Sequence, residues 1–114
     1  MSTLYMFLVL LALVTPLSFG EILTDPTLNV YGEDHRLVHS DRRRGVQYAT
    51  DIGFCRLKGF KTAGGVSAEP LLDGPFVILR PDGEVSQTFP NRRDHRVNFK
   101  VFTTIECLGE KGSN

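Results

Sequence analysis

The densest group of chemically active side chains in the sequence falls within residues 90–96. Asp94 and His95 stand side by side, and three arginines surround them: Arg92, Arg93 and Arg96. A histidine beside a carboxylate can act as a general base, and guanidinium groups bind anions through charge-assisted hydrogen bonds. Adjacent side chains on a strand or loop point apart, however, and no serine or cysteine nucleophile lies nearby in the sequence. We therefore predict no catalytic residue. Residues 90–96 are interpreted either as an anion-binding loop or as a solvated hairpin loop. A small hydrolase using His95 is the least favoured hypothesis.

A second basic stretch precedes this segment. Residues 36–61 carry seven lysines and arginines against two aspartates, whereas the whole chain carries 13 basic and 13 acidic residues and a formal net charge of zero. Bulk charge thus gives no reason to expect nucleic acid or a membrane as partner. The local patches indicate either an ordinary solvated surface or an anion-binding face. The candidate anion-binding set has five members: Arg56, Lys58, Arg92, Arg93 and Arg96.

Three consecutive arginines, Arg42, Arg43 and Arg44, stand in front of Gly45. In an exported chain such a run is a hypothetical cleavage site for a basic-specific protease, and the chain would then be a secreted precursor. The residue four before the cut would be Asp41 rather than an arginine, so the run does not match a furin-type site. The alternative is a solvated basic run in front of the folded domain.

His35 and His39 are four residues apart, a spacing that can bind a metal on a helix. The segment is a poor helix, and no further ligand lies close by in sequence. We predict neither a metal site nor a cofactor.

Cys55 and Cys107 are the two cysteines of the chain. An even number of cysteines in an exported protein favours a disulfide, and two cysteines allow one intramolecular pairing. The alternatives are free thiols or bridges between chains. We predict a Cys55–Cys107 disulfide.

The elements expected to carry these residues indicate a small α+β domain. Residues 97–107 alternate apolar and polar side chains, which predicts a strand with one buried face. Residues 76–89 predict a hairpin, in which Pro81 and Asp82 occupy the turn and Gly83 supplies a positive φ. A helix over about residues 51–58 carries Cys55. We expect a small antiparallel sheet, made of the hairpin and the strand, to pack on this helix and be joined to it by the disulfide.

The remaining segments are expected to lie outside that sheet. Residues 21–45 are polar and their apolar residues keep no sustained period, which predicts a poorly ordered N-terminal arm. Residues 62–75 are rich in glycine and proline, which predicts a loop. The folded domain would then span residues 46–108, with a polar tail at 109–114.

The first twenty residues have the features of a cleavable signal peptide. Residues 4–14 form an apolar run of eleven, long enough for a signal peptide but too short to span a bilayer. Ser18 and Gly20 supply small side chains at the expected cut after Gly20. We therefore expect a secreted protein without a stable membrane anchor, extracellular or, in a bacterium, periplasmic.

These features together predict a small secreted binding protein without enzymatic activity. The partner class they favour is an extracellular protein or an anionic polysaccharide. The alternatives are a precursor processed at Arg42–Arg44 and the hydrolase described above.

Overall fold

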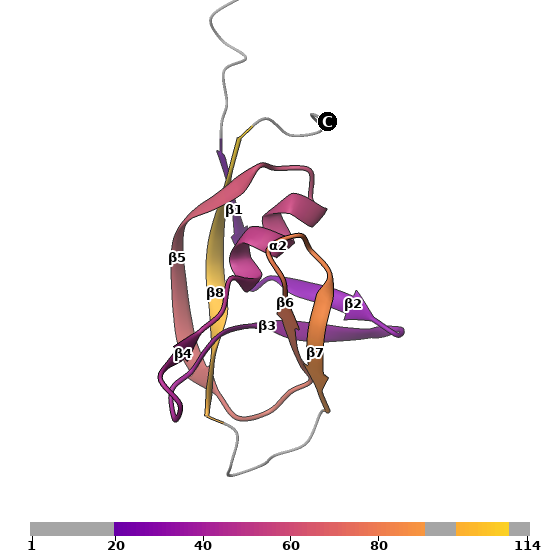
Figure 1. Cartoon of the computed structure of the whole chain (residues 1–114), viewed down its shortest axis with the longest axis vertical. Coiled ribbons are helices and arrows are strands. Elements are labelled where there is room, and N and C mark those ends of the chain that lie inside the picture. The colour runs from indigo at the N-terminus through magenta and orange to yellow at the C-terminus, as the bar shows by residue number, and fades with distance from the viewer. Residues whose placement is uncertain (1–19, 91–97, 110–114) are drawn as a thin grey trace, which may run out of the picture.

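A computed structural model describes residues 20–90 and 98–109 (Figure 1). In chain order its elements are β1 (Gly20–Thr24), β2 (Thr27–Val30), β3 (Glu33–Asp41), β4 (Val46–Gln47), α2 (Thr50–Leu57), β5 (Thr62–Leu71), β6 (Phe76–Leu79), β7 (Val85–Phe89) and β8 (Phe99–Leu108). The predicted α+β class is confirmed at this coarse level: the described residues form mostly β-sheet, with one short helix among them.

The sheet is larger than the sequence indicated, and it is mixed. Its eight strands follow the order β1-β8-β3-β6-β7, while β2 and β4 pair with β3 and β5 pairs with β8. The β3–β6 pair is parallel, at Arg36–Phe76 and Leu37–Val77, and the remaining pairs are antiparallel. The expected small antiparallel sheet is therefore wrong, because it left out the strands formed before residue 46.

Strand β8 is paired along both edges. Strand β5 follows one edge from Phe99 to Leu108, while β3 takes the start of the other edge and β1 takes its end. Between Phe102 and Thr104 strand β8 advances two residues, while its partner β5 advances only one, from Ala68 to Ser67. This extra residue is a β-bulge, which changes the face on which the following side chains lie. The strict alternation predicted for residues 97–107 is broken there.

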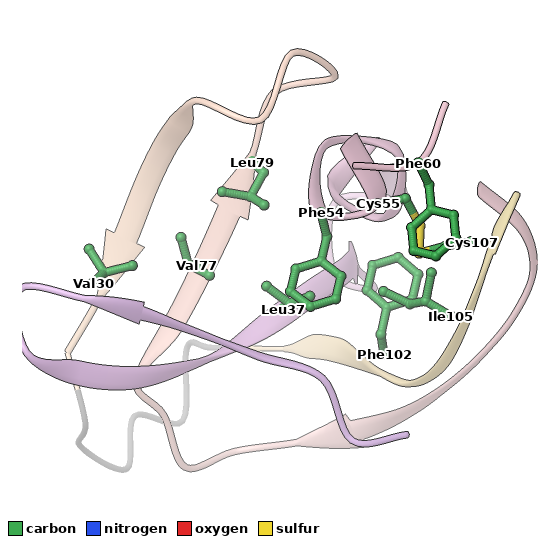
Figure 2. Close-up of a cluster of buried hydrophobic side chains, with 10 residues drawn as sticks. All are labelled: Val30, Leu37, Phe54, Cys55, Phe60, Val77, Leu79, Phe102, Ile105 and Cys107. Atoms are coloured by element: carbon green, nitrogen blue, oxygen red, sulfur yellow. A yellow bond between two sulfur atoms is a disulfide. The ribbon is translucent and has the colours of Figure 1, made fainter. Parts of the chain in front are cut away.

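The bulge lets β8 contribute to two hydrophobic cores. A helix-side core, drawn in Figure 2, contains Val30, Leu37, Phe54, Cys55, Phe60, Val77, Leu79, Phe102, Ile105 and Cys107. A second core contains Val38, Phe76, Ile78, Phe99 and Val101. Consecutive buried residues of β3 and β6 belong to different cores, so both faces of these strands are covered.

This two-sided burial explains why the sequence does not predict the strands of the N-terminal segment. Residues 21–45, expected to be a poorly ordered arm, form β1, β2 and β3, and Leu37 and Val38 are fully buried. A strand covered on both faces lacks the polar–apolar alternation that marks a half-buried strand. The predicted boundary at residue 46 therefore falls inside the sheet, between β3 and its partner β4.

The segment predicted as a loop, residues 62–75, is largely the strand β5. From Ala63 to Val66 this strand advances three residues while β8 advances two, so Gly64 and Gly65 lie in a second bulge. Strand β5 pairs with β8 alone, which makes it an edge strand. Proline and glycine are tolerated at sheet edges and bulges, and this is why Pro70 does not interrupt it.

The predicted hairpin and helix are confirmed. Strands β6 and β7 pair antiparallel, the Gly83 N–H donates to the Arg80 carbonyl over 2.9 Å, and Gly83 has a φ of +93°. Helix α2 covers Thr50–Leu57, and the Leu79 N–H donates to its Thr50 hydroxyl over 3.2 Å. The start of the helix is thereby tied to the end of β6.

The predicted disulfide joins this helix to β8. Cys55 and Cys107 are bonded with their Cα atoms 5.3 Å apart, and neither residue is exposed (Figure 2). The bridge lies inside the helix-side core, beside Phe60 and Ile105. It connects residues separated by 52 positions in the sequence.

Replacing both cysteines by alanine is expected to lower the free energy of unfolding by about 4 kcal/mol, because a closed loop of this length restricts the unfolded chain. Urea denaturation of the oxidised protein and of C55A/C107A measures the difference. A loss below about 1 kcal/mol would contradict this role of the bridge.

Gly53 sets how closely α2 approaches β6. A Cβ atom at this position would overlap the Arg80 carbonyl oxygen and lie 3.2 Å from the Leu79 Cβ. Because the obstacle is backbone, it cannot move aside as a flexible side chain would. The glycine weakens the helix locally but allows it to lie against the sheet.

The substitution Gly53→Ala is therefore expected to cost about 2–4 kcal/mol of stability, despite the higher helix propensity of alanine. Gly65→Ala is the matched control, since its Cβ would meet only the Glu106 carboxylate at 3.8 Å. Thermal denaturation of both variants tests the argument, which fails if they are equally stable.

Candidate functional site

The β3–β4 turn presents the three consecutive arginines on a fixed backbone. The Arg42 N–H donates to the Asn98 carbonyl over 2.8 Å, and the Arg44 N–H donates to the Asp41 carbonyl over 3.2 Å. Gly45 completes the turn with a φ of +66°. The arginine run is thus a turn inside the sheet rather than part of a poorly ordered arm.

Asp41 supports this turn from within the protein. Asp41 is only 3% exposed. One of its carboxylate oxygens accepts the Arg43 N–H over 3.2 Å, and the other lies 3.6 Å from the Arg44 Nε. Within residues 20–90 and 98–109, the guanidinium groups of Arg42 and Arg43 have no ion-pair or hydrogen-bond partner. Both residues are exposed. Among the described residues, therefore, no carboxylate compensates the charges of Arg42 and Arg43.

Two of the predicted anion-binding residues lie elsewhere, at the C-terminal end of α2. The Arg56 Nε donates to the Lys61 carbonyl and its Nη1 to the Pro81 carbonyl, each over 3.0 Å. Arg56 thus ties the helix to the start of β5 and to the β6–β7 turn. The Lys58 Nζ lies 5.3 Å from the centre of the Phe54 ring. In Figure 1 this region lies far from the β3–β4 turn, so the basic residues of 36–61 do not form one face.

The other predicted residues, Arg92, Arg93, Asp94, His95 and Arg96, lie outside the described residues, so their role stays a prediction. The described residue that follows this segment most closely is Asn98, whose carbonyl accepts the Arg42 N–H. The chain therefore enters β8 beside the arginine turn.

The structure also brings together two residues that sequence reasoning did not single out. Ser40 Oγ lies 3.0 Å from His39 Nδ1, and Gln47 Nε2 lies 3.4 Å from His39 Nε2. When the Gln47 amide donates to Nε2, the ring proton sits on Nδ1 and is donated to Ser40. In that tautomer His39 cannot take a proton from the serine hydroxyl, as a base that activates a nucleophile must.

Of the two histidines weighed as metal ligands, His35 is buried with its Nδ1 2.8 Å from the Glu33 carbonyl oxygen. The His39 ring packs edge-on against Phe102, with 5.1 Å between the ring centres. In the part of the chain that the structure describes, no three histidine, cysteine, aspartate or glutamate side chains gather as a metal site would require.

A shallow hollow of about 300 Å³ lies on the sheet where β1, β8 and β5 run together. It is lined by Ile22, Gly65, Val66, Thr104 and Glu106. Next to it, Ser67 Oγ lies 2.6 Å from the hydroxyl oxygens of both Thr103 and Thr104. The hollow thus combines an exposed isoleucine with hydroxyls and one carboxylate.

Across residues 20–90 and 98–109, no helix has the length and apolar character needed to cross a membrane. Comparison with protein-family models, curated proteins and solved structures finds no match for this chain.

Cleavage at the arginine turn is expected to leave the two pieces associated. The N-terminal piece would keep β1, β2 and β3, whose Val30, Leu37 and Val38 are buried in the two cores. Brief treatment with an arginine-specific protease, followed by gel filtration, should give two fragments by mass spectrometry that elute together at the intact volume. Release of the N-terminal fragment without denaturant would instead support the precursor hypothesis.

Proposed function

We propose that this chain is a secreted, non-enzymatic binding protein that recognises an anionic polysaccharide through the arginine turn, residues 42–45. The observation that carries the proposal is the pair of guanidinium groups on Arg42 and Arg43. They have no ion-pair partner among the described residues, and they lie on a turn whose backbone is held by Asp41 and Asn98. Because the backbone is already fixed, binding need not pay for ordering it.

The chemistry of these groups favours an oxyanion ligand. A guanidinium donates two parallel hydrogen bonds to a sulfate or carboxylate, and two adjacent guanidinium groups can engage successive anionic groups of one chain. The residues of the turn are exposed at the surface, which suits an extended polymer better than a small molecule that needs an enclosing pocket. An acidic protein surface could use the same contacts and is one outcome of the test below.

Secretion is supported by two independent features. The apolar segment at residues 4–14 and the small residues before Glu21 have the pattern of a signal peptide. The Cys55–Cys107 bridge is the type of bond that persists in oxidising compartments outside the cytosol.

Retention on a sulfated polysaccharide column, eluted with a salt gradient, tests the proposal. The variant R42A/R43A is expected to elute at lower salt and to bind the free polysaccharide about tenfold more weakly, because two exposed charge pairs are lost. The matched control K58A/R80A removes two exposed charges from the region of α2 and the β6–β7 turn. It should elute with the wild type.

If K58A/R80A elutes at lower salt than the wild type and R42A/R43A does not, the binding site lies at α2 and the proposal is overturned. Equal elution of all three proteins at physiological salt would also overturn it, and would direct attention to an acidic protein partner. The variant R92A/R93A reports separately on the predicted basic loop.

A further inference from the structure

The carboxylate of Glu106 lies near Gly20, the first residue of β1, where the secreted chain is expected to begin. One oxygen accepts the Gly65 N–H of β5 over 3.1 Å. The other lies 3.7 Å from the position that a Cβ atom on Gly20 would occupy. The side chain thus bridges from β5, over β8, to Gly20 at the start of β1.

Glycine leaves the space for this arrangement. A Cβ atom at Gly64 would lie 2.5 Å from a Glu106 carboxylate oxygen, and one at Gly20 would lie 3.2 Å from the Leu108 side chain. The carboxylate therefore rests on β5 at a bulge without side chains and faces a β1 residue without a side chain. In the described structure no lysine, arginine or histidine forms an ion pair with it.

The register of β1 and the reach of the Glu106 side chain together bring the carboxylate near the first peptide bond of β1. Gly20 lies opposite Leu108 and Glu21 opposite Cys107, so the Gly20–Glu21 peptide lies one to two positions along the ladder from Glu106. The side chain covers this distance, since a carboxylate oxygen lies 3.7 Å from the Cβ position of Gly20. Hydrolysis of the Gly20–Glu21 peptide bond by water releases Gly20 as a carboxylate. The Glu21 nitrogen takes up protons and becomes an ammonium group.

We propose that Glu106 is the binding site for this α-ammonium, and that removal of residues 1–20 creates an ion pair that fastens β1 to β8. The proposal rests on the predicted cleavage after Gly20. It assigns a ligand to the hollow formed by Ile22, Gly65, Val66, Thr104 and Glu106: the protein's own N-terminus.

The other charges near this site leave the pairing intact. Glu21 adds a second carboxylate on β1 itself. Lys61 directly precedes β5, and its N–H donates to the Leu108 carbonyl over 2.9 Å. The side chain of Lys61 packs against Gly109, beyond the end of β8, whereas Glu106 turns toward Gly65.

Acylation of the N-terminal amine in the secreted full-length product tests the proposal. Acylating reagents attack the neutral amine, and a carboxylate partner favours the ammonium form. Near pH 7.5 the wild-type α-amine should react about two- to fivefold more slowly than that of Glu106→Gln, the range set by an exposed ion pair. Glutamine keeps an acceptor for the Gly65 N–H, and Glu69→Gln, on the same edge strand, is the control that should behave as wild type.

Mass spectrometry of the secreted protein separates the two ways of failing. A first residue other than Glu21 removes the ammonium from this position and overturns the premise. A first residue of Glu21 with equal acylation rates in wild type and Glu106→Gln overturns the ion pair itself. In urea, where β1 is detached, the rates should become equal for all variants.

Discussion

The pairing of both edges of β8 is the constraint on which the rest of the structure depends. Three strands hydrogen-bond to this one strand, and its bulge at Thr103 gives side chains to two separate cores. The disulfide then attaches the helix to Cys107, near the end of β8. Without β8 neither core would close, because each takes residues from it that are at most 5% exposed.

How far the sequence could predict this fold depended on whether the signal was local. The β6–β7 turn follows from Pro81, Asp82 and Gly83 alone, and the Cys55–Cys107 pairing follows from the two cysteines of a chain that is expected to be exported. Strand β3 could not be recognised in this way, because burial on both faces removes its alternation. Strand β5 was hidden by Gly64, Gly65 and Pro70, which an edge strand with bulges accepts.

The same distinction between local and long-range signals applies to the candidate site. The arginine run was visible as a motif, but its support was not, since it depends on the buried carboxylate of Asp41 and on a carbonyl of Asn98 distant in sequence. An aspartate before the run and a glycine after it are turn signals that pointed in this direction. Conversely, Arg56 has the charge of an anion-binding residue, but two of its five N–H donors are bound to backbone carbonyls, which the sequence does not reveal.

The β1–β8 pairing joins the first described strand of the chain to the last, and this has a consequence for the order of events during biosynthesis. Strands β1 and β3 leave the ribosome early, yet their partner β8 emerges only when almost the whole chain has been made. Intermediate lengths of the chain lack the strand that completes both cores, so no stable subset of the sheet can form ahead of it. Folding is therefore expected to be a single late step governed by long-range pairing, which is slow compared with the folding of helical domains of similar size.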